Sequence, residues 1–117
     1  MKVSIKRVYE KPDAADGFRV LVDRLWPRGV SKEHADVDEW LKDVGPSDDL
    51  RKWFGHVPDR FGEFATRCRA ELAAGEAFSS LKAVVADHEN VTLVYSAKDE
   101  EHNDAVALAE FLRDQKK

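Results

Sequence analysis

The run Val20-Leu21-Val22 constrains the fold of this chain more than any other stretch, because three successive positions are apolar. A strand with one face in water alternates apolar and polar residues, whereas a continuous apolar run is typical of a strand covered on both faces. We therefore expect residues 18–24 to form a central strand with helices on both sides. A second such run at residues 91–96 predicts its neighbour in the sheet.

The other predicted elements rest on apolar periodicity and on capping residues. They are a first strand at 3–9, a helical turn after Ser31, a short helix between Ser47 and Gly55, amphipathic helices at 59–74 and 78–88, and a final helix after residue 103. Residues 36–44 fit a helix or a strand, because the apolar residues from Val37 to Val44 have helical spacing in a segment short enough for either. Alternating strands and helices predict a single α/β domain over residues 1–117, with a mainly parallel central sheet flanked by helices in a Rossmann-like three-layer sandwich.

Length and composition are typical of an ordinary globular domain. At 117 residues the chain has the size of one domain, with 43% apolar and 36% charged residues. No apolar run approaches the roughly 20 residues of a membrane span, the first residues resemble no secretion signal, and the single cysteine, Cys68, forms no internal disulfide. We therefore expect a cytoplasmic protein without a membrane partner. A net charge of -4 argues against a broad nucleic-acid-binding surface.

Basic residues gather near the amino terminus, although the whole chain is acidic. Residues 1–30 hold seven Lys or Arg against four Asp or Glu, whereas the remainder holds twelve against nineteen. Arg24 and Arg28 follow the predicted central strand, and open α/β sheets bind ligands at the carboxyl ends of their strands. Two neighbouring guanidinium groups can hold the oxygens of one phosphate or carboxylate. The alternative is that Asp23 pairs with one arginine and that the set only orders the loop.

The polar loop at residues 98–103 follows the second apolar run, so it is expected at the same edge of the sheet. His102 is a candidate general acid or base, because histidine titrates near neutral pH, and Asp99 or Glu100 would orient its ring. Asp99 is also a candidate amino-terminal cap of the final helix, where backbone amides favour an anion. The alternative is a charged, capped helix start with no catalytic role.

Further residues beside these loops are predicted to bind the ligand together with Asp23, Arg24 and Arg28. They are Trp26, Trp53, His56, Ser96 and Asn103. Trp26 and Trp53 can stack on a base or a sugar, and for both the alternative is packing in the core. The third tryptophan, Trp40, is predicted to pack in the core.

No metal site and no particular cofactor are predicted. The residues with suitable ligand chemistry are Asp23, His56, Glu100 and His102, and their spacings match no standard ligand pattern. The chain also lacks a glycine-rich dinucleotide turn, a phosphate loop with Gly-Lys-Ser/Thr and a Gly-x-Ser-x-Gly elbow. Cys68 falls on the apolar stripe of a predicted helix, so we expect a buried structural thiol, which argues against cysteine-based sulfur or phosphoryl transfer.

Four stretches of the chain resemble one protein family. They are VLVDRLWPRG at residues 20–29, DEWLKDVGPS at 38–47, LRKWFGH at 50–56 and LVYSAKDEEHN at 93–103. Together they resemble the YeaO-like family of uncharacterised conserved bacterial proteins, also described as domain of unknown function 488, over nearly the whole chain. One departure is Gly45, where the family pattern leads us to expect alanine.

The resemblance implies a compact α/β fold and a cytoplasmic bacterial protein, and it implies no activity. A distantly similar branch carries a Val-Asp-Val-Arg stretch and a Cys-His-Arg stretch in corresponding places. His102 corresponds to the histidine of that branch, but no cysteine precedes it here. The resemblance therefore does not extend to a thiol mechanism.

Three functional hypotheses follow. The leading one is a protein that binds a small anionic ligand, phosphate- or carboxylate-bearing and nucleotide-like, at the carboxyl ends of the strands; it is either a binding protein or an enzyme in which His102 transfers the proton. The second is a non-catalytic module for single-stranded nucleic acid or a protein partner, and the third is that the charged loops only stabilise the fold. Catalysis requires His102 within hydrogen-bonding reach of a closed pocket. The sequence predicts no particular oligomeric state.

Overall fold

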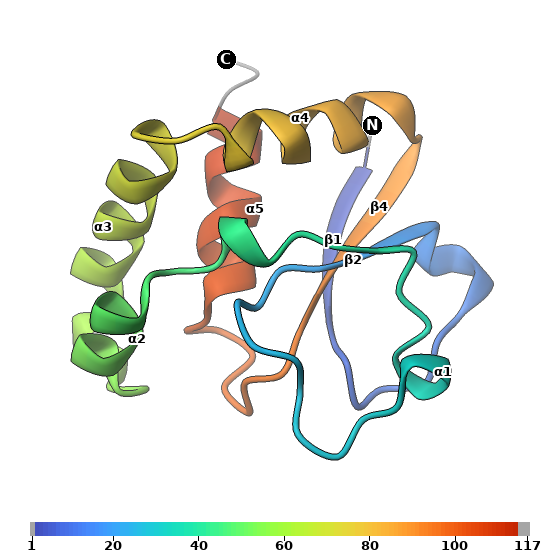
Figure 1. Cartoon of the computed structure of the whole chain (residues 1–117), viewed down its shortest axis with the longest axis horizontal. Coiled ribbons are helices and arrows are strands. Elements are labelled where there is room, and N and C mark those ends of the chain that lie inside the picture. Colours follow the sequence, from blue (N-terminus) through green and yellow to red (C-terminus); the bar gives the residue numbers. More distant parts are fainter. Residues whose placement is uncertain (1, 115–117) are drawn as a thin grey trace.

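The computed structural model describes residues 2–114 and contains a four-stranded sheet in the order β1-β4-β2-β3 (Figure 1). The strands are β1 (Lys2–Arg7), β2 (Phe18–Leu21), β3 (Glu39–Trp40) and β4 (Asn90–Tyr95). Each of the three strand pairs is parallel, so the carboxyl ends of all strands lie at one edge of the sheet. The predicted α/β class is confirmed.

The centre of the sheet is the pair β2 and β4. Val20 pairs with Leu93 and Leu21 with Val94, and all four side chains are fully buried. Val20 and Leu93 belong to the core on one face of the sheet, whereas Leu21 and Val94 belong to the core on the other. Burial on both faces explains why both strands appear as continuous apolar runs, and it confirms the predicted neighbours. β2 ends earlier than predicted, at Leu21, so the charged residues that follow it lie in a loop.

Helices cover the two faces of the sheet unequally. They are α1 (Lys32–Ala35), α2 (Asp48–Phe54), α3 (Phe61–Ala73), α4 (Ala77–Asp87) and α5 (Asp104–Asp114). α4 and α5 contribute Leu81 and Leu108 to the larger core, and the short α1 with its flanking loops closes the other face through Ala35 and Val37. α2 and α3 lie outside α5 (Figure 1). Among residues 2–114, no helix is both long and apolar enough to cross a membrane.

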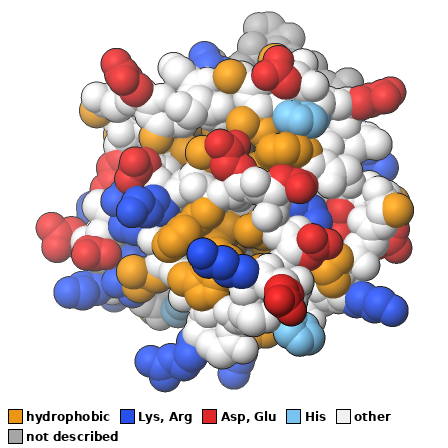
Figure 2. Space-filling view, turned by 45° about the vertical axis from the view of Figure 1, so that its right-hand side comes forward, with side chains coloured by type: hydrophobic (Ala, Val, Ile, Leu, Met, Phe, Trp, Pro, Cys, Tyr) orange, Lys and Arg blue, Asp and Glu red, His pale blue; other side chains and the backbone are white. Residues whose placement is uncertain are grey.

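Residues 36–44 form neither a full helix nor a full strand. They contain the two-residue edge strand β3 and then a 3₁₀ turn at Lys42–Val44. Trp40 lies on this edge strand and is 38% exposed, so the prediction that it packs in the core is wrong. Its indole N–H donates to the Asp23 carbonyl at 2.7 Å, and its ring meets the Trp26 ring edge-on at 5.4 Å. On the face of the molecule drawn in Figure 2, apolar side chains reach the surface between charged side chains.

The predicted limits of the short helices are confirmed by their caps. The Ser31 hydroxyl accepts a hydrogen bond from the His34 amide, and the Ser47 hydroxyl accepts one from the Leu50 amide. Gly55 ends α2 in the left-handed conformation with a φ of 54°. These caps satisfy backbone groups that a helix end leaves without partners, and they fix where α2 meets the loop after β2.

Gly17 connects the 3₁₀ turn at Ala14–Asp16 to β2 and has a φ of 67°. A Cβ atom at this position would lie 2.3 Å from the Asn90 carbonyl oxygen. We expect Gly17→Ala to lower the free energy of unfolding by about 2 kcal/mol or more, because the positive φ and the clash both oppose the new side chain. Urea denaturation measures the loss.

Gly62→Ala is the matched control. Gly62 lies in α3, and among residues 2–114 no heavy atom of a neighbouring group lies within 4 Å of its Cβ position. The same substitution is expected there to leave stability unchanged or to raise it by up to about 1 kcal/mol. Equal losses in the two variants would contradict the steric role of Gly17.

Candidate functional site

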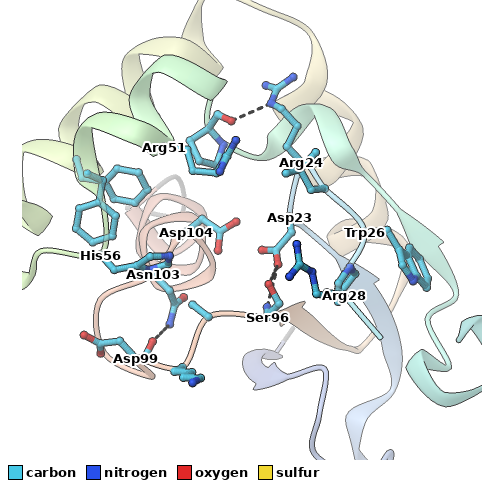
Figure 3. A pocket seen from close by; sticks show the side chains of 17 residues that line it. Asp23, Arg24, Trp26, Arg28, Arg51, His56, Ser96, Asp99, Asn103 and Asp104 are labelled. Atoms are coloured by element: carbon cyan, nitrogen blue, oxygen red, sulfur yellow. Dashed lines mark hydrogen bonds between the residues drawn. The ribbon is translucent and has the colours of Figure 1, made fainter. Parts of the chain in front are cut away.

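A cavity of about 740 Å³ opens at the carboxyl ends of β2 and β4 (Figure 3). Its walls come from the loop after β2, the loop between β4 and α5, Pro46, and the facing sides of α2 and α3. This is the edge at which parallel α/β sheets usually bind ligands, and the volume is typical of a small-molecule site.

Most of the residues predicted as a site are brought together in this cavity. Those that line it are Asp23, Arg24, Trp26, Arg28, His56, Ser96, Asp99 and Asn103. Three predicted residues, Trp53, Glu100 and His102, are not part of the lining. The sequence reasoning also missed several lining residues: Arg51, Phe54, Phe64, Lys98 and Asp104.

Asp23 joins the ends of the two central strands. Its Oδ2 atom accepts hydrogen bonds from the Ser96 amide at 2.9 Å and from the Ser96 hydroxyl at 2.6 Å. Among the ion pairs of residues 2–114, none includes Asp23. The alternative in which Asp23 pairs with an arginine is therefore wrong, and its carboxylate is held by Ser96 instead.

Asp104 faces Asp23 across the cavity (Figure 3). It is the first residue of α5, and its carboxyl group lies close enough to that of Asp23 for the two charges to interact. Burial, followed by the charge of Asp23, raises the pKa of Asp104 well above its ordinary value. Both effects oppose the charged form of Asp104 and favour its protonated form. The sequence signal that could have found Asp104 is an acidic residue at the start of a helix, directly after the polar loop.

Arg24 stabilises the wall of the cavity through hydrogen bonds to backbone carbonyl groups. Its Nε atom donates to the Pro46 carbonyl at 2.8 Å and its Nη2 atom to the Gly45 carbonyl at 2.9 Å. Two of the donors of its guanidinium group are thus used on backbone that is itself buried. A Cβ atom at Gly45 would lie 2.7 Å from the Arg24 amide nitrogen, so glycine fits this close approach better than the alanine expected from the family pattern.

Arg28, Arg51 and Lys98 place exposed positive charge around the cavity. Arg28 and Lys98 take part in no ion pair among residues 2–114, and Arg51 makes one exposed contact of 3.4 Å with Asp48. The position of the Arg28 backbone is set by the Tyr9 hydroxyl, which donates to its carbonyl at 3.1 Å. These side chains keep donors free for a ligand.

The structure pairs His102 with Asp99, which lines the cavity, but His102 itself is not part of the lining. The Nδ1 atom of His102 lies 2.9 Å from the Asp99 carboxylate, and the imidazole ring meets Phe61 edge-on at 5.4 Å. Hydrogen bonds, first from the Glu101 amide and then from His102, hold the pKa of Asp99 below its ordinary value. The predicted orientation of His102 by Asp99 is present, but the predicted place of His102 in a pocket is not.

Asn103, not Asp99, occupies the capping position of α5. Its Oδ1 atom accepts from the Val106 amide at 2.9 Å, and its Nδ2 atom donates to the Asp99 carbonyl at 2.8 Å. The prediction that Asp99 caps the final helix is wrong, because the helix begins later and Asp99 accepts amides within the loop. Asn103 thereby fixes the loop between β4 and α5.

Only one of the two tryptophans predicted to bind the ligand lies in the wall of the cavity. Trp26 lines the cavity, and its indole N–H donates to the Val30 carbonyl at 2.6 Å. Trp53 instead lies under the guanidinium groups of Arg60 and Arg67, at 5.4 and 4.4 Å from the ring centroid. His56 lines the cavity with a φ of 59°, a conformation that residues other than glycine seldom adopt and that is often found at ligand sites.

The described residues assemble neither a metal centre nor a reactive thiol. Among residues 2–114, no three His, Cys, Asp or Glu side chains are placed to hold a metal ion together. Cys68 is buried in α3, as predicted, and burial raises the pKa of its thiol to about 12. The reactive thiolate form is therefore negligible at neutral pH.

The structure defines a small α/β protein with a cavity of mixed charge at the carboxyl edge of a parallel sheet. The chain belongs to the DUF488 family: the family model described as "Inactive DUF488-N3 subclade" matches residues 2–117. This match confirms the YeaO-like resemblance of its sequence motifs.

Two similar proteins match the chain over almost their whole lengths. The chain is 45% identical over 114 residues to the uncharacterized protein YeaO of Escherichia coli (strain K12), which covers 97% of this chain and 98% of the relative. It is 42% identical over 111 residues to the uncharacterized protein Rv3073c of Mycobacterium tuberculosis (strain ATCC 25618 / H37Rv), with 95% and 93% covered. No solved structure matches the chain.

Arg24 and Arg28 are expected to differ in their effect on stability. Arg24→Ala removes the donors to two buried carbonyl groups, so we expect it to lower the free energy of unfolding by about 1–3 kcal/mol. Arg28→Ala removes an exposed side chain without an ion pair and is expected to stay within about 0.5 kcal/mol of the wild type. Urea denaturation of both variants measures the difference, and equal losses would show that both arginines serve the fold.

Asp104→Asn is expected to change how stability varies with pH. The pKa of Asp104 is higher in the folded chain than its ordinary value of 3.8, so the protonated form stabilises the fold at low pH and this contribution is lost as the pH rises toward the raised pKa. Asparagine imitates the protonated form at every pH. The stability of the variant relative to the wild type should therefore rise with pH above about 4 and level off above the raised pKa.

Denaturation curves at a series of pH values measure this difference, and the shared effects of other carboxylates cancel in it. The control is Asp87→Asn, at the exposed end of α4 and outside the cavity. Its difference from the wild type should stay flat with pH. A flat difference for Asp104→Asn as well would contradict the raised pKa of Asp104.

Proposed function

We propose that this protein binds a small anionic ligand, bearing a phosphate or a carboxylate group, in the cavity at the ends of β2 and β4, and that it does not convert the ligand chemically. The observation that carries the proposal is the free positive charge of Arg28 and Lys98, which line the cavity without ion pairs among residues 2–114. Arg51 adds a third exposed cation. Arginine in particular matches the paired oxygens of phosphate and carboxylate.

The walls suit a ligand with an apolar part next to its anionic group. Phe54 and Phe64 stack on one another with centroids 4.2 Å apart and line the cavity, and Trp26 and Pro27 line it from the loop after β2. A cavity of about 740 Å³ has room for a ligand the size of a sugar phosphate or a nucleotide. Cations at the mouth would then hold the anion while the aromatic groups cover the rest.

Binding without chemistry is favoured by the position of the reactive groups. The only thiol, Cys68, is buried with a raised pKa. His102, which was predicted to transfer the proton, is not among the lining residues, and its ring packs edge-on against Phe61. The description of the matching family as an inactive subclade agrees with this part of the proposal.

The proposal predicts that phenyl phosphate, which joins an aromatic ring to a phosphate group, binds and raises the melting temperature. We expect Arg28→Ala and Arg51→Ala each to weaken its binding about tenfold or more, because each removes charge-assisted hydrogen bonds worth about 1.5–3 kcal/mol. Calorimetric titration measures the affinities, with ethyl phosphate and acetate as smaller anions in the same series.

Lys52→Ala is the matched control, because Lys52 lies beside Arg51 on α2 but outside the cavity lining. Its affinity for phenyl phosphate should equal that of the wild type. An equal loss in Lys52→Ala, or no binding of any of the three anions, would refute the proposal. Binding of a short oligonucleotide with a steep salt dependence would favour the nucleic-acid module instead.

A further inference from the structure

The interior of the cavity carries a charge pattern that an anion alone does not satisfy. Asp23 and Asp104 face each other in the cavity (Figure 3), and the side chains of Arg28, Arg51 and Lys98 line the same cavity. A ligand with only negative charge would bring that charge close to two carboxyl groups. The arrangement is complementary to a ligand that carries both signs of charge.

The pair of carboxyl groups has acceptor capacity that the protein leaves unused. Ser96 donates only to the Oδ2 atom of Asp23, and the Ala105 amide donates to the Oδ1 atom of Asp104 at 2.9 Å. Among the ion pairs of residues 2–114, none compensates either carboxylate. An acidic pair that is held in place but lacks a cation is costly to keep in a partly buried site.

We infer that the ligand of this cavity is a zwitterion, an amine that also bears a phosphate or carboxylate group, and that its ammonium group binds between Asp23 and Asp104. This inference rests on the proposed function and names the class of ligand for the same cavity. The ammonium group donates up to three hydrogen bonds to carboxylate oxygens, and the anionic group reaches Arg28, Arg51 and Lys98.

A proton leaves when such a ligand binds. In the free protein, burial and the charge of Asp23 raise the pKa of Asp104 and favour its protonated form. The ammonium group supplies a positive charge that favours the ionised form of Asp104, so the proton held by Asp104 passes to the solvent. The amine keeps its own protons, no covalent bond forms or breaks, and one positive charge replaces another between the carboxylates.

The other charged groups that line the cavity act on both the amine and the anion. They are Arg24 and Arg28 from the loop after β2, Arg51 from α2, His56 after it, and Lys98 and Asp99 from the loop after β4. Their effects are common to two probes that share one phosphate ester. The ratio of two such affinities therefore isolates the amino group.

The test compares 2-aminoethyl phosphate with ethyl phosphate by calorimetric titration of the whole chain at pH 8, where both phosphate groups are doubly ionised because their second pKa is about 6. We expect the amino compound to bind at least about tenfold more tightly, because its ammonium group makes charge-assisted hydrogen bonds. Titration in two buffers of different ionisation enthalpy should show more proton release with the amino compound than with ethyl phosphate. The affinity ratio should increase with pH until Asp104 is ionised in the free protein, and then level off.

Asp104→Asn provides the decisive variant. It should bind ethyl phosphate at least as well as the wild type does but show a smaller preference for the amino compound, because only Asp23 remains to hold the ammonium group, and no difference in proton release. Asp87→Asn, outside the cavity, should keep the full preference for the amino compound.

The outcomes separate the inference from the proposed function. Failure of both probes, and of phenyl phosphate, to bind would refute anion binding itself. Binding of both probes with equal affinity, or an undiminished preference in Asp104→Asn, would overturn the zwitterionic ligand while anion binding stands. The affinity comparison on the wild-type chain tests the ligand class without any variant.

Discussion

The hydrogen bonds from Ser96 to Asp23 join the ends of two neighbouring strands, and the cavity depends on this junction. One oxygen of Asp23 accepts both the amide and the hydroxyl of Ser96, at 2.9 and 2.6 Å. Because β2 and β4 are paired in parallel up to Leu21 and Val94, the two residues leave the sheet close together. The carboxylate is thereby held opposite Asp104, the first residue of α5. A polar junction of this kind places charge at the sheet edge without exposing the apolar core beneath it.

The two arginines of the loop after β2 have different tasks. Arg24 donates to the carbonyl groups of Gly45 and Pro46, so it ties this loop to the segment before α2. Arg28 has no ion pair among residues 2–114 and lies exposed at the cavity. Two of the hypotheses drawn from the sequence thus apply to different residues: one arginine supports the fold, and the other remains available to an anion. A carboxyl pair kept without a cation has a cost in stability, and such costs are commonly found where a ligand binds.

Sequence reasoning predicted most of the polar residues that line the cavity, but it did not predict how every side chain points. The apolar runs, the caps Ser31 and Ser47, and the polar segments after both central strands were predicted in place. The predictions were wrong where the role of a residue depends on the direction in which its side chain points. His102 was the favoured catalytic residue, yet its ring packs against Phe61 rather than into the cavity. Trp40 has apolar spacing, yet the edge strand that carries it leaves it 38% exposed.

The sequence by itself determined the class of fold, the family, the order of the elements and the edge of the sheet at which charged loops gather. These properties follow from local patterns: apolar runs, helical spacing and capping residues act on neighbours in the chain. Only the tertiary structure decided which charged groups face one another. Asp104 meets Asp23, and Arg24 meets the carbonyl groups before α2, because parallel pairing and helix packing bring distant segments together. The partners of a polar side chain depend on these distant contacts, and periodicity along the chain carries no record of them.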